Sequence, residues 1–217
     1  MNKIEIERKF RPENKDFKFL YENGRLINTQ SIKDVIYDDA GLSLIISGKK
    51  IRKRTIDSGQ PEWQLKESRD REIGNLDKNI EHGEQYIRDL LKFGKGPMEE
   101  ELEIKGYIPL CELITFRSIF EVQESKIKEL FTIVIDNVSV EDPNWKDRFG
   151  EVELILDSDS SDDIIRKAEQ KINWFVSKHN FNYKNVQGKL FEFFKKGKPH
   201  YFKLLVKAGL VEEGSKL

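Results

Sequence analysis

Charged and apolar side chains alternate near the start of the chain. In Ile4–Phe10, the residues Glu5, Glu7 and Lys9 occupy every second position. Successive side chains of a β-strand point to opposite faces, so this spacing places two carboxylates and an amine on one face. Carboxylate oxygens bind hard divalent cations, and an amine binds anions. A solvent-facing amphipathic strand has the same pattern, so a site requires partners elsewhere in the chain.

A basic counterpart lies in the segment Lys50–Ile56. Lys50, Arg52 and Arg54 again occupy alternate positions and share one face of a predicted strand. Lysines on an exposed edge strand can serve only to prevent aggregation. Arginine at two of the three positions favours anion binding, because its planar guanidinium matches the geometry of phosphate oxygens.

Further charges stand in apolar strands of the second half. Glu151 and Glu153 alternate with apolar residues, and Arg117 and Asp136 each stand alone in a strand rich in Ile, Val and Phe. Burying an unpaired charge is costly. Each of these side chains therefore faces either water or an opposite charge.

Together, the alternating charges come from at least five predicted strands. The acids are Glu5, Glu7, Asp136, Glu151 and Glu153, and the bases are Lys9, Arg52, Arg54, Lys66, Arg117 and Lys189. If these strands close into one barrel, both signs point inward. Such an interior needs a polyanion for the bases and a hard cation for the acids, because unpaired buried charge is expensive. A phosphate chain with Mg²⁺, or with Mn²⁺ as the alternative, satisfies both needs.

The remaining elements would cover the outside of this barrel. Apolar stripes predict helices over Asp16–Asn23 and from Ile164 to about Lys178. Pro143 and Gly150 indicate a loop over Glu141–Gly150. Between residues 69 and 96, a strand over Glu84–Asp89 and a helix over Tyr86–Phe93 fit the sequence equally.

One segment repeats the acidic pattern without the same partners. Glu101, Glu103 and Lys105 have the spacing of the first strand and follow two more glutamates. We interpret them as a solvated element and not as a second site. Spacing alone therefore does not define the site.

Composition limits the classes of function. The chain has 217 residues, and its 38 basic residues nearly cancel its 39 acidic ones, so net charge gives no reason to expect nucleic-acid or membrane binding. Cys111 is the only cysteine, which fits a reducing compartment. No apolar run reaches membrane-spanning length, and the start is too charged for a secretory signal. We expect a single domain over residues 1–217, soluble, cytoplasmic and monomeric.

The chain resembles the CYTH superfamily, the triphosphate tunnel metalloenzymes, and within it the thiamine triphosphatases. The resemblance runs in order through the segments IEIERKF, DVIYDD, IRKR, EWQLK, ITFRS, IVIDN, GEVEL and GKL. It implies an α+β, mainly β, fold, in which a closed antiparallel eight-stranded tunnel barrel carries helices packed on its outside. A barrel of this size leaves room for one small ligand.

The resemblance also implies roles for the alternating charges. It implies metal binding, with Mg²⁺ or Mn²⁺, by Glu5, Glu7, Asp136, Glu151 and Glu153. It implies binding of a small-molecule triphosphate by Lys9, Arg52, Arg54, Lys66, Arg117 and Lys189, and it places Glu7, Lys9 and Lys66 in the chemistry. The implied reaction is metal-dependent hydrolysis of thiamine triphosphate to thiamine diphosphate and phosphate.

One departure concerns the organic group. Animal thiamine triphosphatases have a tryptophan, thought to stack on thiamine, two residues before the first arginine of the basic strand, and this chain has Lys50 there. Trp63 lies in the next predicted strand but on the face opposite Lys66. Inorganic triphosphate, a nucleoside triphosphate, cyclisation of ATP as in class IV adenylyl cyclases, and polyphosphate binding without turnover remain alternatives. The five acids argue against the last, because binding alone needs mainly the bases.

Overall fold

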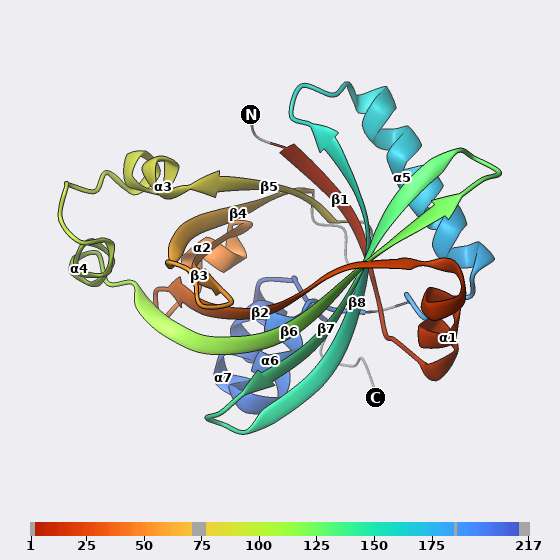
Figure 1. Cartoon of the computed structure of the whole chain (residues 1–217). Helices are drawn as coiled ribbons and strands as arrows, with labels where there is room; N and C mark the ends of the chain where they lie inside the picture. The colour runs from red at the N-terminus through yellow and green to blue at the C-terminus, as the bar shows by residue number, and fades with distance from the viewer. Residues whose placement is uncertain (1–2, 71–76, 185, 213–217) are drawn as a thin grey trace.

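Eight antiparallel strands close into a barrel in the computed structural model, which describes residues 3–70, 77–184 and 186–212 (Figure 1). Around the barrel their order is β1-β5-β4-β3-β2-β6-β7-β8. The strands are β1 (Lys3–Phe10), β2 (Arg25–Asp38), β3 (Lys49–Ile56), β4 (Glu62–Asp70), β5 (Asp77–Gly83), β6 (Ile108–Glu124), β7 (Glu129–Val140) and β8 (Trp145–Asp157). The predicted fold class, a mainly β barrel with external helices, is confirmed.

Helices lie around this barrel, with α5 along one side and α3 and α4 at the opposite edge (Figure 1). They are α1 (Asn14–Asn23), α2 (Ser43–Ile46), α3 (Glu84–Leu91), α4 (Met98–Ile104), α5 (Asp162–Lys178), α6 (Lys189–Gly197) and α7 (Pro199–Lys207). Among the described residues, no helix is long and apolar enough to cross a membrane.

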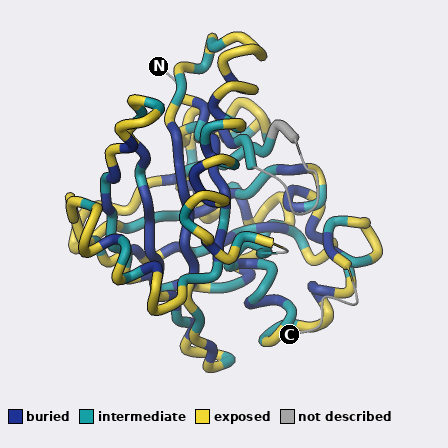
Figure 2. The backbone as a smooth tube through the Cα atoms, turned by 90° about the vertical axis from the view of Figure 1, so that its right-hand side faces the viewer, coloured by how far each residue is buried: buried dark blue, intermediate teal, exposed yellow. Residues whose placement is uncertain are grey.

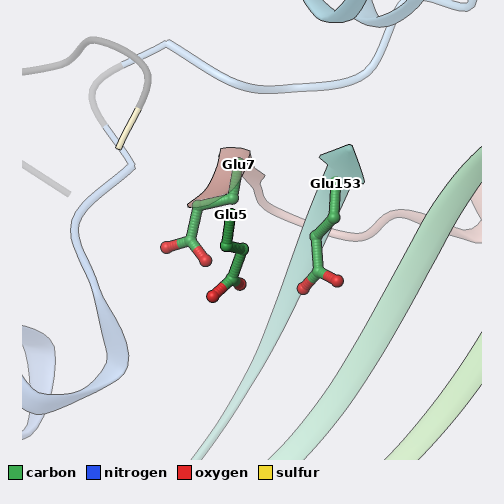
Figure 3. Close-up of side chains that lie close together, drawn as sticks. All are labelled: Glu5, Glu7 and Glu153. Carbon is green, nitrogen blue, oxygen red and sulfur yellow. The ribbon is translucent and has the colours of Figure 1, made fainter. Parts of the chain in front are cut away.

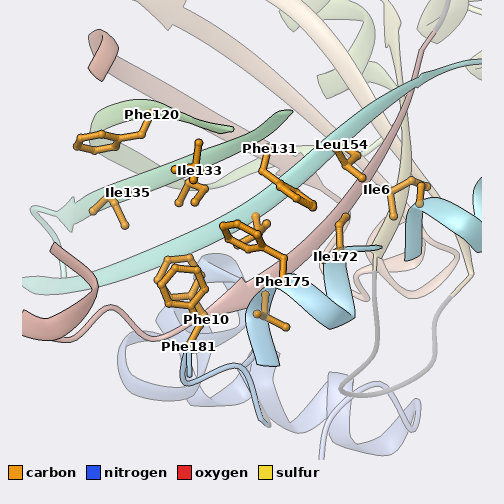
Figure 4. Packing of buried hydrophobic residues seen from close by; sticks show 14 of the residues in the cluster. Ile6, Phe10, Phe120, Phe131, Ile133, Ile135, Leu154, Ile172, Phe175 and Phe181 are labelled. Atoms are coloured by element: carbon orange, nitrogen blue, oxygen red, sulfur yellow. The ribbon is translucent and has the colours of Figure 1, made fainter. Parts of the chain in front are cut away.

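The outward face of β1 packs against α5. Ile4 and Ile6 are fully buried in a cluster that includes Ile172 and Phe175 of the helix (Figure 4). Phe10 continues this cluster and stacks on Phe181, with ring centroids 4.5 Å apart. Each such side chain contributes about 1.5–3 kcal/mol when buried, so this face fixes β1 firmly and directs its alternate residues into the barrel.

A second cluster joins the C-terminal helices to β8. Trp145 and Phe149 are buried there, and the ring of Trp145 lies 5.6 Å from that of Phe193 in α6. The predicted loop over Glu141–Gly150 is therefore wrong in its second half. The strand begins at Trp145, opposite Val140. Burial of Trp145 and Phe149 stabilises the strand by more than a glycine at position 150 destabilises it. Helix α6 itself was not predicted.

The segment around β5 was the hardest to interpret from sequence. The sequence allowed either a strand or a helix after residue 83, and the structure has the helix, α3. Strand β5 lies directly before that helix. Asp77, Asn79 and Glu81 line the interior cavity, whereas Ile80 is the one apolar side chain that β5 buries outside. Because both faces are mostly polar, the hydrophobic period of a strand is missing. Residues 71–76 lie outside the described part of the chain.

The repeated acidic pattern lies on a helix and not on a strand. Glu101 and Glu103 belong to α4, where residues two apart do not share a face. Glu103 and Lys105 are exposed, so the interpretation of this segment as solvated is confirmed. Figure 2 shows the same division over the described residues, with buried stretches in the barrel strands and exposed residues at the loops and helix surfaces.

Candidate active site

A cavity of about 460 Å³ occupies the inside of the barrel. Every predicted site residue except Asp136 lines it, and Lys50 lines it as well. The neighbours of these residues on the same strands, such as Ile6, Ile51 and Val152, are fully buried on the outer face. Strand alternation therefore aims the charges inward, as the sequence predicted.

Three carboxylates converge on one side of the cavity, and we call Glu5, Glu7 and Glu153 the carboxylate wall. Glu7 lies directly opposite Glu153 in the β1–β8 ladder. One oxygen from each of the three lies within 4.8 Å of the others, and Figure 3 shows the three side chains next to one another, extending to the same side of their strands. Three carboxylates this close repel one another unless positive charge balances them, so the group fits a divalent cation with oxygen ligands.

The electrostatics of the carboxylate wall are uneven. Burial, with the charges of Glu5 and Glu151, raises the pKa of Glu153 well above its usual value. Burial and Glu7 likewise raise the pKa of Glu5. The pKa of Glu7 is lowered in spite of its burial, because Lys66 and Lys9 lie beside it. Of these three carboxyls, only Glu7 has a pKa below its usual value.

Two lysines connect this wall to the rest of the cavity. Lys66 Nζ donates to Glu5 Oε2 and to Glu7 Oε2, each at 3.1 Å. Lys9 forms ion pairs with Glu7 and with Asp77. Both amines therefore lie where a phosphate group next to a bound cation would contact them.

The basic wall consists of Lys50, Arg52 and Arg54 on β3, separated from β1 by β4 and β5. Arg54 forms a two-bond pair with Asp34, with Nε–Oδ1 and Nη2–Oδ2 distances of 2.7 Å. Arg52 donates from Nε to Gln64 Oε1 at 2.9 Å and forms an ion pair with Glu81. These bonds hold both guanidiniums in fixed orientations.

A mixed cluster lies on β6, β7 and β8. Arg117 donates from Nε to Asp136 Oδ1 at 2.8 Å and from Nη2 to Oδ2 at 2.7 Å, and its Nη2 lies 3.4 Å from Glu151 Oε2. Lys189, the first residue of α6, forms an ion pair with Asp136. Of the five predicted metal ligands, Asp136 and Glu151 thus lie among cations, outside the group of three.

Sequence reasoning missed three acids that hold the bases in place. Asp34, buried on β2, pairs with Arg54, and the arginines keep its pKa well below its usual value despite burial. Asp77 and Glu81 pair with Lys9 and Arg52. Asp34 could have been found, because it lies on the same strand face as Ile32 and Ile36, where a charged side chain among apolar ones stands out. The other two lie in the polar segment that gave no strand signal.

Trp63 is not part of the cavity wall. It is buried on the outer face of β4, 5.1 Å between ring centroids from Tyr37, in a cluster with Met98 and Leu102 of α4. Its position confirms that Trp63 and Lys66 point to opposite faces. Trp63 therefore cannot replace a stacking residue at position 50.

Comparisons with known proteins agree with this geometry. Protein PH1819 of Pyrococcus horikoshii OT3 superposes with a TM-score of 0.62 at 16% identity, over 88% of this chain and 99% of that chain. A candidate adenylate cyclase of Vibrio parahaemolyticus gives 0.54 at 19% identity, over 86% and 95%. HpAC1 of Hippeastrum, described as having a dominant triphosphatase activity, gives 0.51 at 13% identity, over 90% and 96%.

These structural likenesses concern the fold. No match was found among the curated proteins. The model of the CYTH domain family matches residues 3–179, which contain all eight strands and α5. The chain therefore belongs to the CYTH domain family.

Proposed function

We propose that this protein is a metal-dependent hydrolase that releases the terminal phosphate of a small-molecule triphosphate in the cytoplasm. The observation that carries the proposal is the composition of a single cavity, in which three converging carboxylates face cations from β3, β4, β6 and α6. The described dominant triphosphatase activity of HpAC1, a protein of similar fold, agrees with it.

Glu5, Glu7 and Glu153 would hold the cation, for which we propose Mg²⁺. A bound divalent cation supplies charge neutralisation at phosphate oxygens and polarisation of water. Arg52, Arg54 and Arg117 bind the phosphates that are not transferred, since Glu81, Asp34 and Asp136, respectively, already orient their guanidinium groups.

Lys9 and Lys66 act at the boundary between cation and phosphate. Both donate to Glu7, so each amine is held within reach of the phosphate group beside the carboxylate wall. We assign them to the stabilisation of charge that develops on the transferred group. Asp136 acts by orienting Arg117 and Lys189, with which it is paired.

The resemblance in sequence favours thiamine triphosphate as the substrate, with thiamine diphosphate and phosphate as products. A second candidate, inorganic triphosphate, is favoured by Lys50, because an amine replaces the stacking ring in the cavity wall. Cyclisation of ATP is a different reaction on the same scaffold, and its product pattern separates it from hydrolysis.

The test compares thiamine triphosphate, inorganic triphosphate and ATP side by side, with Mg²⁺ and with a chelator. The proposal predicts orthophosphate release that requires Mg²⁺. Pyrophosphate release from ATP would instead indicate a cyclase. Binding of all three substrates without any product would indicate a barrel that binds polyphosphate and does not turn over.

A further inference from the structure

The cations of the cavity differ in one respect. Each of the predicted phosphate-binding bases has a carboxylate partner: Lys9 with Glu7, Arg52 with Glu81, Arg54 with Asp34, Lys66 with Glu5, Arg117 with Asp136 and Lys189 with Asp136. Lys50 has none. Within the described residues, its amine forms neither a hydrogen bond nor an ion pair, although it lines the same cavity.

The surroundings of Lys50 disfavour the protonated form of its amine. Lys66 lies directly opposite in the β3–β4 ladder, and Arg52 is its neighbour on the same face. Burial, together with Arg52 and Lys66, lowers the pKa of Lys50 to about 7, and the carboxylate of Asp34 opposes this only in part. A buried amine among cations gains strongly from an anion placed beside it.

Triphosphates differ in the charge they bring to this position. An inorganic triphosphate ends in an ionisable phosphate at both ends, whereas esterification removes an ionisable oxygen from one end. Thiamine triphosphate also carries a thiazolium cation beyond its ester oxygen. An amine in the cavity wall attracts the first kind of end and repels the second.

We infer that Lys50 is a specificity-determining residue, which binds the unesterified end of inorganic triphosphate and disfavours triphosphates that carry a cationic organic group. This inference rests on the proposed function, because it concerns how the same cavity chooses among triphosphates. It assigns a role to Lys50, the residue of the basic wall that has no carboxylate partner.

The cavity contains one feature that points the other way. Phe191 and Leu210, from the C-terminal part of the chain, also line it and could contact an organic group. If they bind such a group, Lys50 has no part in selection. A variant that loses only the charge of Lys50 separates these alternatives. Its preference between the two substrates changes if Lys50 selects them, and stays the same if Phe191 and Leu210 do.

The experiment uses the full chain with Lys50→Met, which removes the charge at similar length, and Lys50→Arg, which restores it. Lys53→Met is the matched control, since Lys53 lies on the same strand but pairs with Glu99 outside the barrel. kcat/KM is measured with Mg²⁺ for inorganic triphosphate and for thiamine triphosphate. Binding of inorganic triphosphate without metal is measured by calorimetry.

We expect Lys50→Met to lower kcat/KM for inorganic triphosphate by about 10- to 100-fold, mainly through KM, and to leave thiamine triphosphate unchanged or improved. Lys50→Arg should restore the preference, and Lys53→Met should match the wild type. Equal losses for both substrates, or no change in their ratio, would overturn the inference.

The calorimetric measurement tests the role of Lys50 independently of the proposed hydrolase function. If the wild type releases phosphate from neither substrate, the proposed function fails, and metal-free binding still decides the role of Lys50. Weaker binding of inorganic triphosphate by Lys50→Met than by Lys53→Met then supports the inference. Equal binding by these two variants overturns it.

Discussion

The carboxylate wall and the basic wall face each other across one cavity, and both arise from charges at alternate positions of a strand. They differ in how their charges are balanced. On the basic wall, the buried Asp34 holds Arg54 and the more exposed Glu81 holds Arg52, and within the described residues only Lys50 lacks a partner. On the carboxylate wall, two lysines compensate Glu7, whereas Glu153 forms no ion pair within the described residues.

This difference shows where ligands are needed. A wall whose charges are internally paired is oriented before any ligand arrives, which lowers the cost of binding. A wall with an unpaired charge gains most when a ligand supplies the opposite sign. Glu153 and Lys50 therefore mark the two positions at which a cation and an anion, respectively, bring the largest electrostatic gain.

The largest effect should come from the carboxylate wall. Glu7→Gln removes a charge that contacts Lys9 and Lys66 and would bind the cation, so we expect kcat to fall by about 10³-fold in a variant that still folds into the barrel. Phosphate release with Mg²⁺ measures this. The control is Glu103→Gln on the exposed face of α4, and equal activity of the two variants would contradict the assignment.

A smaller loss is expected on the basic wall. Arg54→Ala removes a guanidinium that Asp34 orients, and we expect kcat/KM to fall by about 10²-fold, largely through KM. Steady-state kinetics beside Lys53→Ala, an outward neighbour on β3, measures the difference. Equal kinetics for the two variants would remove Arg54 from the phosphate site.

The balance within the basic wall can be tested through stability. Asp34→Asn leaves Arg54 without its buried partner, so we expect the free energy of unfolding to fall by about 3 kcal/mol. Added inorganic triphosphate, without metal, should restore more stability to this variant than to the wild type, because it supplies the missing negative charge. Thermal unfolding with and without the anion measures both effects.

Asp163→Asn is the matched control for this experiment, since Asp163 is exposed on α5 and pairs only with neighbouring cations. Its thermal unfolding should stay close to that of the wild type, because exposed ion pairs contribute little to stability. If the anion stabilises the wild type and Asp34→Asn equally, Asp34 does not balance the phosphate-binding charges.

The smallest expected effect is a change in the number of protons taken up when inorganic triphosphate binds. Burial, together with Arg52, Lys66 and Lys189, lowers the pKa of Lys50 to about 7, and Asp34 opposes this shift. Above pH 7 the Lys50 amine is mostly neutral, and a bound anion favours its charged form. Binding of inorganic triphosphate at pH 8 should therefore take up a fraction of a proton more in the wild type than in Lys50→Met. Calorimetry in two buffers of different ionisation enthalpy measures this, and equal uptake would show that Lys50 does not meet the anion.

The sequence predicts the cavity well where the outer face of a strand is apolar. Glu5 and Glu7 could be assigned to one face because Ile4 and Ile6 define the other, and the same holds for Glu151 and Glu153 beside Val152. The structure places these residues and the predicted bases around one cavity. Their catalytic and ligand-binding roles stay predictions.

The sequence fails where neither face carries an apolar period. β5 faces the cavity with Asp77 and Glu81 and buries only Ile80 outside, so its strand and its two ion pairs were missed. Spacing also could not separate Asp136 from the carboxylate wall. Its place beside Arg117 depends on the β6–β7 register, which local sequence does not specify.

The most direct test of the division between the two walls is Mn²⁺ binding, followed by electron paramagnetic resonance in the absence of any phosphate compound. The wild type and Arg54→Ala should bind Mn²⁺ alike, because Arg54 belongs to the basic wall. Glu153→Gln should bind it at least about 10-fold more weakly, because it removes one of three converging carboxylates. Equal Mn²⁺ binding by the wild type and Glu153→Gln would contradict the account.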